Sequence, residues 1–391
     1  MKIYLVVHRY GRDIAGGSEF QCREFALRLS DDNEVTVLTS CAKDYITWAN
    51  DYPPGEETDG NIKVRRFLTS RKRNPGEFAV HSSQVFTGMA SEAMENKWFE
   101  LNGPCMPDLL NFIKDNANIP DIFLFFSYRY YQSFFGLPLV SKKSVLVPTA
   151  EEDPAIRLKV LKNYFRLPVA IVYESIEERE LIKKITGGYT PPGQITGCGI
   201  PEPGQVSKDC PFEKNMIPRR FFLYLGRVDP NKGCRQMFDY YTSYAQECAE
   251  ESLPLIIAGK SVMPVPEHPG IRYLGYISDG QREWLLSKAE ALIMPSFYES
   301  LSLVILESWN YRRPVLVNAS CKVLKGQARR SDGGLYYENY MDFAECLKWF
   351  ANNPETASIL GEQGFEYVER EYRWPAVMKR LKKTLETALE K

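Results

Sequence analysis

The amino-acid sequence predicts an α/β protein built from two halves of similar size, each a parallel sheet covered by helices. Apolar segments of strand length alternate with periodic segments of helix length along most of the chain, which is typical of parallel sheets with helices on both faces. Glycine and proline crowd together between residues 187 and 218, as in a linker, and the alternation starts again after them. The 391 residues are 44% hydrophobic and 25% charged, which suits a globular protein with two domains.

The first half contains six apolar runs that we interpret as strands. They are Lys2–His8, Glu34–Thr39, Asn61–Leu68, Asp121–Ser127, Ser144–Pro148 and Val169–Tyr173. Four periodic segments between them are expected to be helices, namely Ser18–Ser30, Cys105–Asn116, Asp153–Phe165 and Ser175–Ile185. We therefore place a first Rossmann-like domain at residues 1–198, with the linker at its end.

The second half repeats this pattern. One helix is expected at Lys232–Ala249, and the expected strands are Arg220–Leu225, Pro254–Ala258, Arg272–Leu274, Ala291–Pro295 and Arg313–Asn318. We assign this second Rossmann-like domain to residues 199–372. Residues 373–391 are predicted to form an amphipathic helix because apolar residues recur every four positions, at Val377, Leu381, Leu385 and Leu389.

Charge and composition argue against several classes of protein. Lys and Arg total 49 against 50 Asp and Glu, so the net charge of -1 provides no overall field that would attract nucleic acid. The three histidines offer little material for a metal centre, and the nine scattered cysteines contain no Cys-x-x-Cys pair. Apolar runs are too short for a signal peptide or a membrane span. We therefore expect a cytoplasmic protein that needs no metal.

Ligands of open parallel sheets bind beyond the carboxyl ends of the strands, so the turns there are the candidate sites. The first is Ala15-Gly16-Gly17-Ser18-Glu19, which opens a helix. Glycine lets the backbone approach a ligand, and the helix N-terminus attracts an anion. A tight turn with Ser18 as the N-cap explains the motif as well. The Gly-x-Gly-x-x-Gly fingerprint of NAD-binding proteins is missing, which disfavours a dinucleotide.

Two further turns lie in the second half. Arg227 and Lys232 follow the first strand of the second half. A guanidinium and an ammonium group close together are well suited to bind a diphosphate. Glu299 lies in the loop after Pro295, and Glu307 interrupts an apolar helix that begins near Ser302. A buried carboxylate is costly unless it is hydrogen-bonded. Sugar or ribose hydroxyls would satisfy Glu307, and a salt bridge to a neighbouring element is the alternative.

These three motifs, in this order, resemble the retaining nucleotide-sugar glycosyltransferases of the GT-B fold, specifically glycosyltransferase family 4. The resemblance covers nearly the whole chain and is strongest in the second half. It implies two Rossmann-like domains that face each other across a cleft, with the closing helix crossing back to the first domain. It also implies a metal-independent enzyme without a cofactor, because cations and helix ends neutralise the diphosphate.

The resemblance also implies a role for each motif. Arg227 and Lys232 would bind the donor diphosphate and stabilise the charge of the leaving group. Glu307 would accept hydrogen bonds from the ribose, and Glu299 would touch the transferred sugar. The remaining donor contacts would come from backbone groups, at Leu301, Ser302 and Leu303 in one domain and at Gly16 and Gly17 in the other.

One position departs from the family. Its members commonly have a histidine after a middle strand of the first domain, where this chain has Glu151. We consider Glu151 a candidate catalytic residue that orients the acceptor hydroxyl or stabilises positive charge on the sugar ring. Capping of the helix that follows is the alternative. His8 and His81 are possible substitutes for the missing histidine.

Two groups of residues bear on the acceptor. Cations cluster around one strand end and one helix, at Lys63, Arg65, Arg66, Arg71, Lys72, Arg73, Arg157, Lys159, Lys162 and Arg166. They suit a lipid-diphosphate acceptor or an anionic membrane, and a solvated charged face is the alternative. A second group is aromatic and would form a sugar platform or pack under a loop: Tyr128, Tyr130, Tyr131, Phe134 and Phe135.

The sequence therefore predicts a retaining hexosyltransferase whose donor is a nucleoside diphosphate sugar, with UDP-glucose expected from its frequency in the family. The acceptor would be a glycan or a lipid-linked saccharide, and the setting would be cell-surface polysaccharide assembly, with peripheral contact at the inner face of the membrane. A catalytically silent module that binds nucleotide-sugar or glycan is one alternative. A GT-B epimerase or phosphorylase-like enzyme is another.

Overall fold

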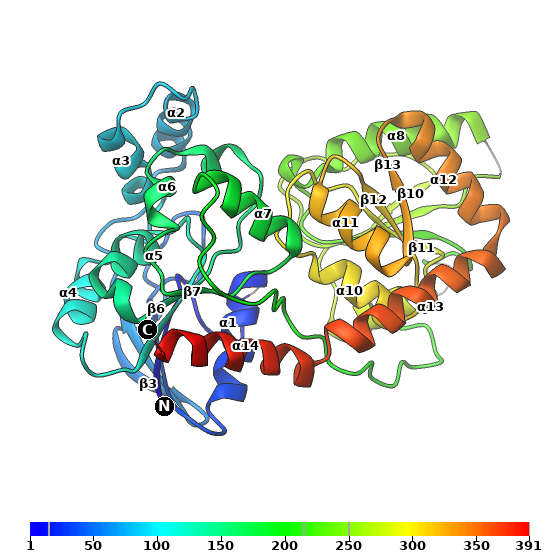
Figure 1. Cartoon of the computed structure of the whole chain (residues 1–391). Helices are drawn as coiled ribbons and strands as arrows, with labels where there is room; N and C mark the ends of the chain where they lie inside the picture. Colours follow the sequence, from blue (N-terminus) through cyan, green and yellow to red (C-terminus); the bar gives the residue numbers. More distant parts are fainter. Residues whose placement is uncertain (15, 214–215, 249–250, 391) are drawn as a thin grey trace. The chain divides into compact units, whose positions relative to one another are not determined.

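The structure is a computed structural model, and it describes residues 1–14, 16–213, 216–248 and 251–390. The chain forms two compact units (Figure 1). The N-terminal unit comprises residues 1–197 and 377–391, and the C-terminal unit comprises residues 198–376. The sequence places the boundaries after residues 198 and 372. Ala15, Ala249 and Lys391, which belong to predicted segments, lie outside the described residues.

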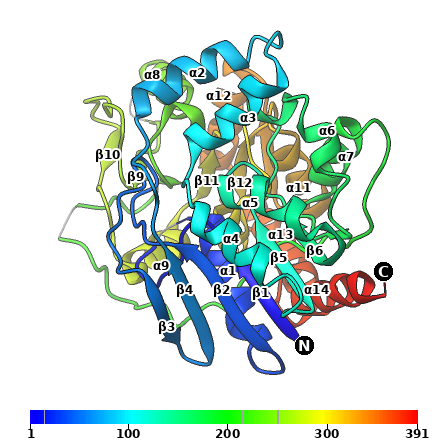
Figure 2. The ribbon, with the colours of Figure 1, turned by 90° about the vertical axis from the view of Figure 1, so that its left-hand side faces the viewer.

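A seven-stranded sheet forms the centre of the N-terminal unit, with the order β3-β4-β2-β1-β5-β6-β7. Its strands are β1 Lys2–Val6, β2 Glu34–Ser40, β3 Gly55–Asp59, β4 Ile62–Phe67, β5 Ile122–Phe126, β6 Ser144–Val147 and β7 Ala170–Ile171. The strands pair in parallel except β3, which runs antiparallel to β4. Figure 2 shows β3, β4, β2, β1 and β5 following one another across this sheet. The order reverses between β1 and β5, which is where a ligand of such a sheet binds.

The helices of this unit differ in part from the prediction. They are α1 Gly17–Leu29, α2 Pro75–Val85, α3 Glu92–Asn102, α4 Pro107–Asp115, α5 Tyr131–Gly136, α6 Leu161–Tyr164 and α7 Ile176–Ile185, with 3-10 helices η1 Leu137–Lys143 and η2 Pro154–Arg157. The predicted helix Asp153–Phe165 is wrong as one element, because Leu158 is extended and separates η2 from α6. Ser18 lies inside α1, and Gly16 takes the N-cap position in its place.

A six-stranded parallel sheet forms the centre of the C-terminal unit, with the order β10-β9-β8-β11-β12-β13. Its strands are β8 Phe222–Leu225, β9 Leu255–Ala258, β10 Ile271–Tyr273, β11 Ala291–Met294, β12 Val315–Asn318 and β13 Gly334–Tyr337. The helical elements are η3 Pro230–Lys232, α8 Cys234–Cys248, α9 Asp279–Lys288, α10 Leu303–Asn310, α11 Lys322–Ser331, α12 Tyr340–Asn352 and α13 Pro354–Glu371. The predicted helix from Lys232 begins at Cys234, because Gly233 is left-handed and ends η3.

The central strands of both sheets are apolar because helices cover the two faces of each sheet. All five residues of β5 and all four residues of β8 are buried. Each unit has a hydrophobic core of its own on which its helices pack. The carboxyl ends of the strands therefore form rigid edges from which loops project. No helix among the described residues is both long and apolar enough to cross a membrane.

The closing helix α14 spans Trp374–Leu389, and its residues from Val377 onward belong to the N-terminal unit. Val377, Leu381 and Leu385 are fully buried, as their spacing predicts, whereas Leu389, the fourth residue of the series, is 46% exposed at the end of the helix. Thr384 accepts a hydrogen bond from the backbone of Gln194 at 3.2 Å. Residues 377–391 therefore belong to the same compact unit as residues 1–197, although they follow the C-terminal unit in the chain.

Candidate active site

The turn after β8 positions the first candidate cation. Gly226 adopts a φ of +143°, which turns the chain at the end of the strand. Arg227 follows, and its Nε lies 2.9 Å from Oδ2 of Asp229. Asp229 also caps η3 by accepting a hydrogen bond from the backbone of Asn231 at 2.9 Å. The guanidinium is therefore held at the carboxyl end of β8 by a carboxylate of its own turn.

Lys232 ends η3 and reaches the loop that follows β11. A Cβ atom on Gly233 would lie 2.1 Å from the carbonyl oxygen of Pro295, so only glycine lets the two turns meet. This close approach places Nζ of Lys232 2.7 Å from Oε1 of Glu299. The structure thus brings two predicted catalytic residues together from loops that are 67 positions apart in the chain.

The start of α10 lies directly beyond this pair. Leu301 and Ser302 are buried, and Leu303 is the first helical residue. Ser302 takes the N-cap position, but its side chain makes no capping hydrogen bond. The first N–H groups of a helix have no partner within the helix, so an anion at this point would find donors and a favourable dipole. These are the backbone groups that the resemblance assigns to the diphosphate.

Glu307 lies on α10 and forms an ion pair with Arg282 of α9. Burial raises the pKa of Glu307 above its usual value, and the opposing effect of the Arg282 charge is smaller. The sequence left two interpretations of Glu307 open: hydrogen bonds to ligand hydroxyls, or a salt bridge to a neighbouring element. The structure shows a salt bridge, to the neighbouring helix α9. The side chain of Arg282 is 37% exposed, so the pair is accessible to a ligand.

The N-terminal unit places the glycine turn over a buried carboxylate. A Cβ atom on Gly16 would lie 2.2 Å from Oε2 of Glu19, so a side chain there would displace that carboxylate. Oε1 of Glu19 lies 2.9 Å from Nε2 of His8 and 2.9 Å from Nε of Arg9. Burial alone would raise the pKa of Glu19, but His8 and then Arg9 outweigh it and lower the pKa to about 2. Gly17 begins α1 above this network.

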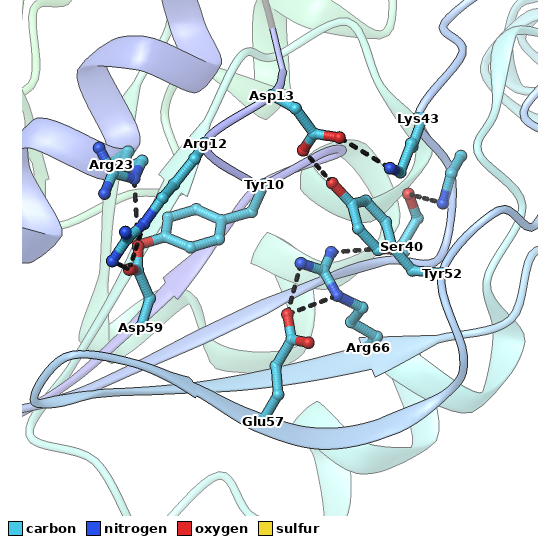
Figure 3. A network of polar contacts seen from close by, with 11 residues as sticks. Tyr10, Arg12, Asp13, Arg23, Ser40, Lys43, Tyr52, Glu57, Asp59 and Arg66 are labelled. Atoms are coloured by element: carbon cyan, nitrogen blue, oxygen red, sulfur yellow. Dashed lines mark hydrogen bonds and ion pairs between the residues drawn. The ribbon is translucent and has the colours of Figure 1, made fainter.

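The segment between β1 and the glycine turn is anchored by charged side chains (Figure 3). Arg12 and Arg23 pair with Asp59 of β3 at 2.8 and 3.1 Å. Asp13 pairs with Lys43 at 2.7 Å, and this hydrogen bond is the main reason why the pKa of Asp13 falls to about 2. The loop is therefore fixed to the edge strand β3, which the sequence analysis did not predict.

Glu151 lies in the loop after β6. Its Oε2 is 3.9 Å from Nη1 of Arg129, whose Nη2 contacts Oδ2 of Asp153 at 2.5 Å. Asp153 caps η2 by accepting from the backbone of Ile156 at 3.3 Å. The capping role considered for Glu151 thus belongs to Asp153. Glu151 is partly exposed beside a cation at the carboxyl end of β6.

Part of the predicted basic cluster makes contacts within the N-terminal unit. Three of its members pair with carboxylates of the same sheet: Lys63 with Glu34, Arg65 with Glu56 and Arg66 with Glu57. The guanidinium of Arg73 lies 5.3 Å from the ring centroid of Trp48 and donates to backbone carbonyls. Charge at these positions therefore stabilises the edge of the sheet.

The aromatic group divides between core and site. Tyr128 and Phe134 belong to the hydrophobic core, where Phe134 stacks on Phe99 with ring centroids 3.6 Å apart. Tyr130 stacks on His8 at 3.9 Å, at the carboxyl ends of β5 and β1. Packing explains the first two residues, and Tyr130 lies at the point where the strand order reverses.

Comparison with known families bears on this arrangement. Residues 212–367 match the family model described as glycosyl transferases group 1. The C-terminal unit carries a group 1 glycosyltransferase domain. The matched range contains Arg227, Lys232, Glu299 and Glu307. A segment of 106 residues is 31% identical to the O-antigen chain mannosyltransferase B of Escherichia coli, a match that covers 25% of this chain and 28% of that protein.

Solved structures resemble the whole chain. Sucrose-phosphate synthase from Thermosynechococcus elongatus superposes with a TM-score of 0.70 at 17% identity, over 99% of each chain. Anabaena Alr3699/HepE in complex with UDP-glucose superposes with a TM-score of 0.65 at 11% identity, over 99% of this chain and 100% of that one. At such identities the likeness shows the fold, and the predicted GT-B fold is confirmed.

Sequence reasoning missed two cations, Arg282 and Arg9, which pair with carboxylates of the candidate site. Arg282, which holds Glu307, lies on a helix that was not predicted, although the Ser278-x-x-Gln281 capping box marks its start. Arg9 and Glu19 form a buried pair that a sequence pattern cannot reveal. Among the described residues, no group of three or more His, Cys, Asp or Glu side chains is placed to hold a metal ion.

Proposed function

We propose that the protein is a retaining glycosyltransferase that transfers a hexose from a nucleoside diphosphate sugar to a glycan or lipid-linked acceptor. The observation that carries this proposal is the ion pair of Lys232 with Glu299, which joins the turn after β8 to the loop after β11, within residues that match the group 1 glycosyltransferase model. Arg227 lies in the same turn as Lys232 and pairs with Asp229. Two cations in this turn suit a diphosphate. A carboxylate beside one of them suits the hydroxyl groups of a sugar.

The ion pairs of the C-terminal unit suggest how the donor binds. Lys232 pairs with Glu299 in the structure, and we expect the lysine to move to the more highly charged diphosphate when the donor enters. Glu299 then accepts hydrogen bonds from the sugar. When the bond between the anomeric carbon and the diphosphate breaks, negative charge grows on the leaving oxygen. Arg227 and Lys232 stabilise that charge. In this proposal the two side chains take the place of a divalent metal ion at the leaving group.

UDP-glucose is the donor that we favour, and the likeness to the UDP-glucose complex of Alr3699/HepE supports it. A mannose donor is a second candidate because a quarter of the chain matches a mannosyltransferase. The name of that relative also supports a role in the assembly of a surface polysaccharide. We further propose that the enzyme acts in the cytoplasm, at the inner face of the membrane, where a lipid-linked acceptor would be presented.

A thermal-shift series would test the donor site. The purified protein is measured with UDP, GDP and ADP, their glucose and mannose conjugates and NAD, with and without a chelator. A ligand that binds the native state raises the melting temperature, so we expect a chelator-insensitive rise with one nucleotide and its sugars. A flat result across the series would refute the donor site. Binding without transfer would favour a silent module, and donor conversion without acceptor would favour an epimerase or phosphorylase.

A further inference from the structure

Two buried carboxylates lie behind the loop that carries Glu151. Glu174 follows β7 and is 2% exposed, and Glu178 lies in the first turn of α7 and is fully buried. A buried carboxylate is strongly unfavourable unless protein hydrogen bonds replace those it made with water. The partners of these two groups therefore show which parts of the structure depend on them.

Both oxygens of Glu178 bind backbone N–H groups. Oε1 accepts from Ala150, in the loop after β6, and Oε2 accepts from Glu174 at 2.6 Å. The backbone of Glu178 donates to Oγ of Ser175 at 3.1 Å, which fixes the first turn of α7. The Glu178 carboxylate thus connects the loops after β6 and β7 to the first turn of α7.

The loop that Glu178 holds is strained. Thr149 adopts a φ of +47°, a left-handed backbone conformation that is uncommon and unfavourable for a β-branched residue. Ala150 is 1% exposed, so water cannot satisfy its N–H group. Glu178 supplies that hydrogen bond and stabilises the turn, and Glu151 is the next residue along the chain.

We propose that Glu178 is a positioning residue for Glu151: its carboxylate holds the Thr149–Ala150 turn and so sets the direction in which Glu151 meets the acceptor. This inference rests on the function proposed above, because that function gives Glu151 its role. Glu174 extends the same network to α1. Its Oε1 accepts from Nε2 of Gln21 at 2.7 Å, and Gln21 lies on the helix that the glycine turn opens.

The charge state of the pair is consistent with this role. Burial raises the pKa of Glu178, and the nearby carboxylates of Glu174 and Glu151 raise it further, against the backbone N–H groups of Glu174 and Ala150 that lower it. Burial raises the pKa of Glu174 to about 7, and the hydrogen bond from Gln21 opposes it only in part. The pair therefore retains a proton near neutral pH, which limits repulsion between the two groups.

Substitution of Glu178 by Gln tests the hold on the turn. Glutamine has the same shape but only one oxygen, so the variant loses one of the two backbone bonds. Hydrogen exchange measured by mass spectrometry on peptides that cover residues 149–153 should become at least about tenfold faster. Glu180→Gln, an exposed change on the same helix, should leave this exchange unchanged. So should Glu174→Gln, because an amide oxygen still accepts from Gln21. Unchanged exchange in Glu178→Gln would overturn the proposal.

A double-mutant cycle tests whether Glu178 acts through Glu151. With the donor that the wild type uses, Glu178→Gln should lower kcat about tenfold and leave the KM for the donor unchanged. The same substitution should have no further effect on kcat in a Glu151→Gln background. An equal loss in both backgrounds would show a purely structural role and overturn the proposal. If Glu178→Gln does not fold, Glu178→Asp, which keeps both oxygens but shortens their reach, takes its place in both experiments.

The two measurements separate this inference from the proposed function. If the wild type transfers no sugar from any donor of the series, the proposed function fails, and the role of Glu151 fails with it. The exchange experiment does not depend on turnover and decides by itself whether Glu178 holds the turn.

Discussion

The charged side chains at the candidate donor site and those that hold the loops of the N-terminal unit differ in how far they are removed from water. In the C-terminal unit, Arg227, Lys232 and Arg282 are 37%, 32% and 37% exposed, and each pairs with a carboxylate on the same or a neighbouring element. In the N-terminal unit, Glu19 and Glu178 are 6% and 0% exposed, and backbone or buried cations hold them. A side chain in an accessible ion pair can leave its partner and bind a ligand instead. A buried charged group cannot reach a ligand, so its role is to stabilise the fold around it.

The largest effect is expected when an exchangeable pair loses its cation. Lys232→Ala should lower kcat/KM for sugar transfer by about 10²- to 10³-fold, because a charge that stabilises the leaving group is lost. The free energy of unfolding should change by less than about 1 kcal/mol, since the pair is partly exposed. Lys325→Ala, which removes a lysine paired with Glu338 at 2.9 Å in the same unit, is the matched control for steady-state kinetics. Full activity in Lys232→Ala would contradict the donor site.

A buried charge of the N-terminal unit should act on stability instead. Glu19→Gln leaves the Arg9 guanidinium buried without its counter-charge and should cost about 3–5 kcal/mol in urea unfolding at pH 7. The pKa of Glu19 is lowered to about 2, so its contribution is present above its unfolded pKa near 4.5 and is lost as the pH falls toward 2. The wild type should therefore lose stability over that range and the variant should not. Glu24→Gln, which alters an exchangeable pair with Arg28 on the same helix, is the control.

Glu174 should change the stability of the protein with pH in the opposite direction to Glu19. Its pKa is raised to about 7, so the protonated form that favours folding is fully present below pH 4.5 and is lost as the pH rises through 7. Glu174→Gln keeps the acceptor for Gln21 and carries no charge. We expect the variant to be more stable than the wild type at pH 8, by up to about 3 kcal/mol, and similar to it at pH 4.5. Parallel denaturation curves at the two pH values measure this, and equal stability at pH 8 would refute it.

The smallest effect is expected at the pair between α9 and α10. Arg282→Gln removes the ion-pair partner of Glu307, so the carboxylate that would accept hydrogen bonds from the ribose is no longer held in place. We expect the Kd for the donor nucleotide at pH 7 to rise about threefold to tenfold, as measured by calorimetry. Lys288→Gln, on the exposed end of the same helix, should leave the Kd unchanged. An unchanged Kd in Arg282→Gln would show that Glu307 does not contact the nucleotide.

The elements that the sequence predicts well are those with a strong apolar signal. The runs Ile122–Phe126 and Phe222–Leu225 are central strands, and alternation with helices was enough to indicate two parallel sheets. Strand β3 was missed because its residues Gly55–Asp59 are mostly polar and lie at an edge with little to bury. The predicted helix Asp153–Phe165 is broken because local periodicity does not report the extended backbone at Leu158.

For the candidate site, sequence alone indicated residue types but not their partners. The spacing of Arg227 and Lys232 after a strand predicted a cationic turn, and the structure adds that Glu299 lies beside Lys232. Ion pairs such as Arg282 with Glu307 depend on how two helices pack, which is a tertiary property. Buried networks such as the one around Glu178 depend on loops that meet only in the folded unit.

The return of α14 to the first unit has a consequence for the order in which the protein is made. Residues 377–391 leave the ribosome after every residue of the C-terminal unit, yet they bury Val377, Leu381 and Leu385 in the unit that precedes it in the chain. The C-terminal unit is a continuous segment that can fold as soon as it emerges. The N-terminal unit keeps an apolar surface uncovered until translation has passed the C-terminal unit, so of these two units the earlier one in the chain is completed after the later one.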